Sequence, residues 1–314
     1  MSNKTFHDLD QQLMSLYRAK EYQQSFELVE REHLNFPQQQ RQIAYWRLCL
    51  HALTGKQAEA LHIFREALAQ GYWYPPRWLK DDPDLLSLQE LPEFQEMVEI
   101  CRRRLAEANA RPELLIAQPV QHVTDFPLLI ALHGNNSNAG DTIKEWSKVT
   151  EQGWLLAVPQ SSQIIGQDAF VWDDREQAIS EIREHLAKVS GEYTIDLNRV
   201  VLGGFSMGGG QAIWMALHQS IKTRGFVALG PYLSEDELKA LPALLEAHKP
   251  IGVRGYILVG DEDHECLGIS RTVVELLNAR GIPCELEVRS GLDHSYPADF
   301  AEAVSKGLSF VEQA

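Results

Sequence analysis

The chain has 314 residues, 44% of them hydrophobic, and its 29 basic and 44 acidic side chains give a formal net charge of −15 at pH 7. These values fit a globular protein long enough for two domains and exclude a predominantly disordered chain. The residues after Pro112 hold 15 basic and 28 acidic side chains, so the negative charge is concentrated there. It argues against nucleic acid or an anionic membrane surface as the main partner, and favours neutral or cationic ligands.

The distribution of cysteines and the N-terminal residues indicate in which cellular compartment the protein is expected. The four cysteines are scattered and form no C-x-x-C pair, which is typical of reduced thiols. The N-terminal MSNKTFHDLDQQ lacks the apolar core of a signal peptide, and no apolar run approaches the roughly 20 residues of a membrane-spanning helix. We therefore expect a soluble, cytoplasmic protein with no membrane span.

Residues 1–110 are predicted to form an all-helical domain. Apolar residues recur at helical spacing between Leu9 and Leu34, and further helices are expected over Ile43–Leu53 and Ala58–Leu68. The two helix pairs align at an offset of 35 residues, and in this they resemble tetratricopeptide repeats. Two copies are fewer than such an array needs to be stable alone, so Leu85–Cys101 is expected to add a capping helical unit. The domain is either a packing module without a ligand or a surface for a protein partner or an oligomer contact.

Residues 111–314 are predicted to form an α/β domain, because Pro112 ends the helical part and short apolar runs then alternate with helical patterns. The expected strands are Leu114–Ala117, Leu128–Leu132, Trp154–Val158, Val200–Phe205, Gly225–Leu229, Tyr256–Val259 and Cys284–Val288. The expected helices are Arg175–Val189, Gln211–His218, Glu235–Ala247, Ile269–Arg280 and Asp299–Val311. The first two strands are expected to pair as a hairpin. This alternation predicts a three-layer sandwich with a mainly parallel sheet and ligands at the C-terminal ends of its strands.

The stretch Val200–Gly210, VVLGGFSMGGG, holds the strongest chemical signal. An apolar strand leads into Gly204-Phe205-Ser206-Met207-Gly208, a helical pattern follows, and together they match the nucleophile elbow G-x-S-x-G. Glycine is expected at the two outer positions because a side chain there would clash where the strand turns back on its own helix. The turn places Ser206 at a helix N-terminus, where backbone N–H groups favour a developing negative charge.

A serine hydroxyl needs a base and an orienting acid to become a nucleophile at pH 7. The base is expected to be His294, which follows the strand over Cys284–Val288. The acid is expected in the loop after Gly260, where Asp261 and Asp263 are both available. The resulting chain order of serine, acid and histidine is the one found when a nucleophile elbow is built on such a sheet.

Two backbone N–H groups are expected to stabilise the oxyanion. Met207 follows the nucleophile directly and supplies the first. Asn135 is expected to supply the second, because it lies in the loop that follows the strand Leu128–Leu132 and comes directly after His133-Gly134. His133 itself is expected to be a structural residue of that loop rather than a base.

From about Leu114 to its end, the chain resembles the α/β-hydrolase superfamily, and within it the phospholipase/carboxylesterase and dienelactone-hydrolase-like esterases. The likeness is carried by Leu132-His133-Gly134, by Gly204–Gly209, by Gly260–Asp263 and by the late His294. It implies Asp263 rather than Asp261 as the acid, because the family acid usually stands three places after the glycine. It also implies an aromatic residue at the substrate pocket near Trp172-Asp173. We assign Trp172, Phe170 and Asn136 to that pocket, with burial in the core as the alternative for the two aromatic residues.

The sequence as a whole predicts a serine esterase that acts on a small-molecule ester through an acyl-enzyme, with thioesters and lysophospholipids as further substrates. No cofactor or metal is expected. The alternative is a cation site in the acidic run Asp261–Glu265, which includes His264. Two other functions stay open: a serine peptidase on the same sheet, and a non-catalytic interaction protein that uses its helical repeats.

Overall fold

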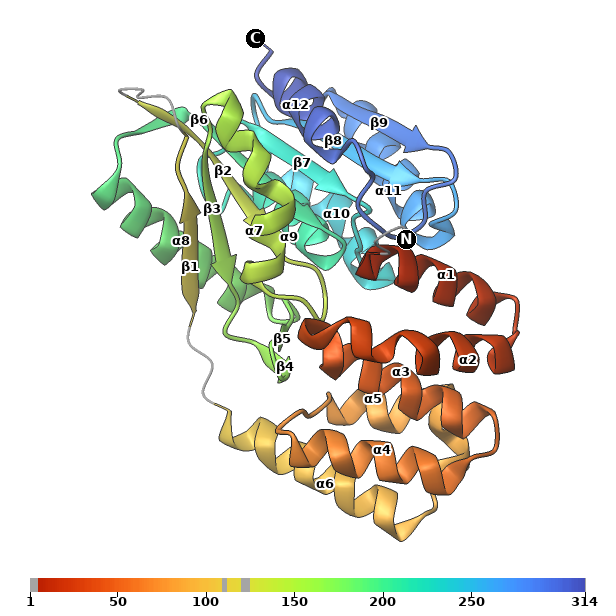
Figure 1. The fold of residues 1–314 in the computed structure, drawn as a ribbon. Helices are drawn as coiled ribbons and strands as arrows, with labels where there is room; N and C mark the ends of the chain where they lie inside the picture. Colours follow the sequence, from red (N-terminus) through yellow and green to blue (C-terminus); the bar gives the residue numbers. More distant parts are fainter. Residues whose placement is uncertain (1–4, 109–111, 120–124, 314) are drawn as a thin grey trace. The chain divides into compact units, whose positions relative to one another are not determined.

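The computed structural model describes residues 5–108, 112–119 and 125–313, and they divide into a helical unit and a sheet-containing unit (Figure 1). The predicted domain boundary, between residues 110 and 111, lies outside the described residues. In this part of the chain no helix is both long enough and apolar enough to cross a membrane.

The helical unit confirms the helices predicted before residue 110. Thr5 begins α1 with a capping box, in which its side chain and that of Asp8 each accept a hydrogen bond from the other's backbone N–H. The α-helices are α1 (Phe6–Arg18), α2 (Tyr22–Glu32), α3 (Gln40–Leu53), α4 (Gln57–Ala69), α5 (Pro76–Asp81) and α6 (Pro92–Glu107). Short 3₁₀ segments cover His33–Asn35, Pro37–Gln39 and Pro83–Leu88. The tetratricopeptide likeness stays a prediction.

The second unit contains a seven-stranded sheet with the strand order β1-β3-β2-β6-β7-β8-β9. Its strands are β1 (Glu113–Ala117), β2 (Phe126–Leu132), β3 (Leu155–Gln160), β6 (Ile195–Phe205), β7 (Gly225–Leu229), β8 (Arg254–Gly260) and β9 (Cys284–Arg289). All neighbours are parallel except β1, which runs antiparallel to β3 at the edge. The small strands β4 (Ile164–Gly166) and β5 (Ala169–Phe170) pair separately.

The predicted hairpin of the first two strands is wrong. β1 pairs with β3, while β2 lies between β3 and β6 and is parallel to both. Nearly every residue of β2 is buried, whereas β1 is only partly buried. A strand as apolar as β2 is stable where helices bury both of its faces and strands pair on both sides. It therefore takes a central position, and the less apolar β1 lies at the edge.

Helices cover both faces of the sheet, as the three-layer prediction required (Figure 1). One buried cluster contains apolar residues of α8 (Arg175–Glu192), α9 (Met207–His218), α10 (Glu235–His248) and α11 (His264–Asn278). The opposite cluster contains those of α7 (Ala139–Trp146) and α12 (Phe300–Val311). Helix α7 was not predicted. A 3₁₀ segment, Ser147–Gln152, follows it. Both apolar clusters hold the strands in place, so the loops at the strand ends start from fixed positions.

Candidate active site

Ser206 occupies a sharp turn between β6 and α9, with φ 55° and ψ −122°. Positive φ is uncommon for a residue other than glycine, and such strain concentrates at functional sites. The turn is held by its own backbone, since Ser206 N–H donates to Leu229 O at 2.9 Å and Ser206 O accepts from Tyr232 N–H at 2.9 Å. The serine is therefore fixed at the end of a central strand.

The two outer glycines of the elbow are sterically required. A Cβ on Gly204 would lie 2.4 Å from the carbonyl carbon of Gly208. A Cβ on Gly208 would lie 2.3 Å from Leu132 O. These distances are shorter than any real carbon–oxygen or carbon–carbon contact, so the strand, the helix and the end of β2 approach as closely as they do only because both positions lack a side chain.

Met207 begins α9 directly after Ser206. The first four N–H groups of a helix have no acceptor within the helix, and the helix dipole adds partial positive charge there. The Met207 amide is one of these four, and it lies at the position predicted for an oxyanion donor. Its thioether faces elsewhere, accepting a hydrogen bond from Trp172 N–H at 3.3 Å.

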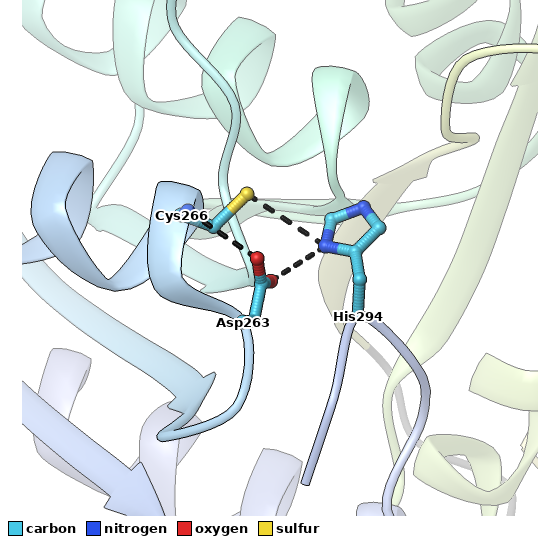
Figure 2. Close-up of side chains that lie close together, drawn as sticks. All are labelled: Asp263, Cys266 and His294. Carbon is cyan, nitrogen blue, oxygen red and sulfur yellow. Dashed lines mark hydrogen bonds and ion pairs between the residues drawn. The ribbon is translucent and has the colours of Figure 1, made fainter. Parts of the chain in front are cut away.

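Asp263 and His294 form a short hydrogen-bonded pair. His294 Nδ1 lies 2.6 Å from Asp263 Oδ2 (Figure 2). Asp263 is only 8% exposed and caps the N-terminus of α11, accepting from Cys266 N–H at 3.3 Å. The start of a helix favours a carboxylate, so α11 helps to hold the charge of Asp263 beside the imidazole.

Gly230 makes room for this pair. It follows β7 with φ 46°, and a Cβ there would lie 3.2 Å from Asp263 Oδ2 and 3.3 Å from His294 Nδ1. Gly260 does the same for the loop that carries the histidine, because a Cβ on it would lie 1.8 Å from Leu292 O. Asp261, the other candidate acid, accepts from Gly291 N–H at 2.7 Å. It shapes the loop and is not the carboxylate bonded to His294.

A cavity of about 350 Å³ lies over Ser206. Three of the predicted site residues, Ser206, His294 and Asn135, line it. The other lining residues are Gly134, Ser137, Asp141, Thr142, Glu145, Phe205 and Tyr296. The structure thus gathers a hydroxyl, an imidazole and the loop after β2 around one space large enough for a small ligand.

The loop after β2 lies directly against the elbow. A Cβ on Gly134 would be 3.2 Å from Phe205 Cδ1 and 3.5 Å from Ser206 Cβ. Its neighbour His133 is fully buried, with Nδ1 2.9 Å from Gly134 O and Nε2 accepting from Ser161 N–H at 3.3 Å. Burial lowers the pKa of His133 to about 4, so its imidazole is neutral at pH 7 and braces the loop.

The three residues assigned to the substrate pocket do not line this cavity. Trp172 is 2% exposed, stacks on the His133 ring at 4.6 Å between centroids and donates from Nε1 to His133 O at 2.9 Å. Phe170 is half-buried and forms a β-bridge with Ser137. Asn136 has φ 55°, a backbone conformation that asparagine tolerates better than most residues. Trp172 therefore supports the loop after β2 through its contacts with His133.

The residues that α7 and the late loop contribute to the cavity were not predicted. Asp141 and Glu145 lie four residues apart on α7, which places both on one helix face. Tyr296 lies two residues after His294, and burial raises the pKa of its hydroxyl. The i, i+4 spacing of the two acids was visible in the sequence, but nothing in it placed α7 beside the elbow.

The acidic run Asp261–Glu265 does not form a cation site of its own among the described residues. Only Asp263 of that run belongs to a cluster of converging metal-ligand atoms, and its companions are Cys266 and His294. Cys266 Sγ lies 3.7 Å from His294 Nδ1 (Figure 2).

Two family models match the chain. Residues 161–311 match the phospholipase/carboxylesterase model, and residues 5–109 match the A/B hydrolase-like N-terminal domain. No curated protein matches the sequence.

Solved structures show similar chains. An uncharacterized protein from Bacillus cereus ATCC 10987 is 30% identical, with a TM-score of 0.54, and the match covers 98% of this chain and 99% of that one. Esterase PE8 is 17% identical with a TM-score of 0.52, over 63% of this chain and 97% of its own. A putative dienelactone hydrolase from Klebsiella pneumoniae is 14% identical with a TM-score of 0.51, over 65% of this chain and 100% of its own. The last two show the fold alone. The chain belongs to the phospholipase/carboxylesterase family of α/β hydrolases and carries the N-terminal helical domain found with such hydrolases.

Proposed function

We propose that the chain is a serine esterase in which Ser206, His294 and Asp263 form the catalytic triad. The observation that carries the proposal is that the three groups lie around one cavity or bond to a group that does. Asp263 binds His294 Nδ1 at 2.6 Å, and His294 and Ser206 line one cavity. The family membership supports ester hydrolysis as the reaction class.

In the proposed mechanism, His294 is the general base. Asp263 holds its Nδ1–H, so the lone pair is on Nε2, the ring nitrogen on the side away from the carboxylate (Figure 2). Nε2 takes the Ser206 proton as Oγ attacks the ester carbonyl, and the imidazolium is stabilised by Asp263. The proton then passes to the departing alkoxide, which leaves as an alcohol, and the acyl group stays on Ser206.

The oxyanion of the tetrahedral intermediate would be stabilised by Met207 N–H and Asn135 N–H. The first lies at the start of α9 beside the nucleophile, and the second lies in the loop that Gly134 brings against Ser206. One such donor is typically worth about 3 kcal/mol of barrier. Water deprotonated by His294 would attack the acyl-enzyme, and the acid product and free Ser206 would be released.

The charges of the cavity support neutral or cationic esters as substrates. Asp141 and Glu145 line it, and no lysine or arginine of the described part of the chain does. Both acids are exposed, and Asp141 is bonded to Lys144 at 2.8 Å. An anionic group next to the scissile ester would meet like charge there. Thioesters and lysophospholipids remain members of the proposed substrate range.

The test is hydrolysis of short p-nitrophenyl esters together with labelling by a fluorophosphonate probe. Wild-type protein is expected to hydrolyse the esters and to be labelled on Ser206, and Ser206→Ala is expected to lose both. Ser137→Ala is the matched control, since Ser137 lines the same cavity but has no proposed role in bond cleavage. Full hydrolysis by folded Ser206→Ala would overturn the assignment. Folded wild-type protein that neither labels nor hydrolyses esters would favour the non-catalytic interaction protein.

A further inference from the structure

The thiol of Cys266 is the third member of the group that contains Asp263 and His294 (Figure 2). Cys266 lies in the first turn of α11, three residues after Asp263, and it is 4% exposed. Its Sγ is 3.7 Å from His294 Nδ1, and its backbone N–H donates to Asp263 Oδ1. The proposed triad uses the carboxylate and the imidazole, but it has no use for the thiol.

We propose that Asp263, Cys266 and His294 bind a Zn²⁺ ion and that this ion switches the hydrolase off. One sulfur, one nitrogen and one oxygen ligand atom lie within 4.8 Å of one another. Zinc takes these three ligand types in tetrahedral geometry, with the fourth position left for water.

The separations of the ligand atoms are close to those that zinc needs. Bond lengths of about 2.0 Å to nitrogen and oxygen and about 2.3 Å to sulfur place the ligands of a tetrahedral site roughly 3.3–3.5 Å apart. Cys266 Sγ and His294 Nδ1 are already 3.7 Å apart. Asp263 Oδ2, at 2.6 Å from Nδ1, would have to turn away by about 0.7 Å to reach that separation. The change amounts to a small rotation of one carboxylate.

The charges also fit a divalent, thiophilic ion. Cys266 would bind zinc as a thiolate, after losing its thiol proton. Zinc binding would release that proton to solvent, and thiolate and carboxylate would together balance the charge of Zn²⁺ in a poorly solvated place. Mg²⁺ and Ca²⁺ require more ligands, all of them oxygen, and do not fit this set.

The inhibition follows from the tautomer of His294, and this part rests on the proposed function. Zinc on Nδ1 takes the lone pair of that nitrogen, so the single imidazole proton must move to Nε2. Nε2–H cannot accept the Ser206 proton, and Asp263 no longer orients the ring. The zinc-bound protein would therefore have no general base, and removing the metal with a chelator would restore it.

A second cluster, Cys49, Asp82 and Asp84, lies in the helical unit. It contains no imidazole, and its carboxylates already accept hydrogen bonds from Tyr45 and Tyr17 at 2.8 Å. Cys49→Ser is therefore a matched control, because it removes a buried thiol from the cluster with the poorer ligand set.

The first measurement is ester hydrolysis in buffered free Zn²⁺, with a non-thiol reductant and with each variant compared with its own zinc-free rate. Wild-type protein and Cys49→Ser are expected to be half-inhibited at the same free Zn²⁺ concentration. Cys266→Ser and Cys266→Ala should need at least about tenfold more, since even the loss of an outer-shell partner costs that much affinity. If both Cys266 variants were half-inhibited at the same free Zn²⁺ concentration as wild-type protein, the proposal would be overturned.

The second measurement separates metal binding from catalysis. Co²⁺ added to Ser206→Ala protein is expected to give a thiolate-to-cobalt charge-transfer absorption at one equivalent, and Zn²⁺ should displace it. The band should be missing in the double variant with Cys266→Ser. If the band is present while wild-type protein fails to cleave esters, the site stands and the proposed function falls. If Ser206→Ala protein gives no such band, the site itself is refuted.

Discussion

A Cβ on Gly208 would lie 2.4 Å from the carbonyl oxygen of His133, so the helix after Ser206 and the loop after β2 touch with no space for a methyl group. This contact joins the two segments that supply the proposed oxyanion donors. Neither segment can shift without moving the other, and the relative position of the two donors is set by a backbone contact.

Gly208→Ala is expected to abolish this fit. The added methyl group would push the loop away from α9, lowering kcat at least about tenfold and destabilising the fold by about 1–3 kcal/mol. Both effects are measured by ester hydrolysis and by urea unfolding. Gly191→Ala in α8 is the control, because a Cβ there meets nothing within 4 Å, and it should gain up to about 1 kcal/mol of stability. Wild-type kcat in Gly208→Ala would show that the contact does not position the donors.

Asp263→Asn is expected to lower kcat by roughly 10³–10⁴-fold with little change in fold. The amide can still reach His294, but it cannot stabilise the imidazolium, and it favours the wrong tautomer. Asp261→Asn is the comparison, since Asp261 bonds the backbone of Gly291 and not the histidine. Steady-state kinetics of both variants decides between the two acids. A larger loss of kcat in Asp261→Asn would reverse the assignment.

His133 is expected to make the sheet-containing unit sensitive to acid. Burial lowers its pKa from 6.5 to about 4, so between these two values the unfolded chain binds a proton that the folded chain does not. The contribution of the neutral His133 ring to the free energy of unfolding is complete above pH 6.5, and it is lost as the pH falls toward 4. The loss is on the order of 3 kcal/mol.

The check is the free energy of unfolding measured from pH 7.5 to 4.5 for wild-type protein and His133→Gln. The variant should be less stable at pH 7.5, because it loses the imidazole ring that stacks on Trp172. Its stability should depend less steeply on pH below 6.5. If the free energy of unfolding depended on pH in the same way in both proteins, His133 would not be the cause of the acid sensitivity.

Glu145 is expected to favour esters that carry a positive charge. A choline ester and its neutral 3,3-dimethylbutyl counterpart have the same shape, so their ratio of kcat/KM isolates the charge. A carboxylate about 5 Å away at the wet rim of a cavity is worth roughly 1 kcal/mol, or about a fivefold preference at low salt.

The preference should fall with added salt and in Glu145→Gln. Glu151→Gln is the control, because this exposed acid lies outside the cavity lining. The two esters are compared for all three proteins at low and at high ionic strength. Equal kcat/KM for both esters in wild-type protein would contradict the expectation while leaving ester hydrolysis itself unaffected.

Much of the fold could be predicted because it is encoded locally. The run Val200–Phe205 and the glycines around Ser206 indicate a strand, a turn and a helix by steric rules that involve only neighbours in the chain. Helix α10 was predicted over Glu235–Ala247, and the capping box of Ser234 and Glu237 that begins it also acts over one turn. Helix α7 was not predicted, although Asn138 caps its start and Asp141 stands in its first turn.

What the sequence by itself determined were the chemical groups and their order: an elbow serine, then acids after Gly260, then a late histidine. Only the tertiary structure decided which of these groups meet. The pairing of β1 with β3, the choice of Asp263 over Asp261 for His294, and the arrival of Cys266 and Glu145 at the site all depend on contacts between segments far apart in the chain. Such contacts are set by close packing of the whole core, in which each strand takes the neighbours that bury its apolar faces. A stretch of sequence states what it can bury, but not against which partner.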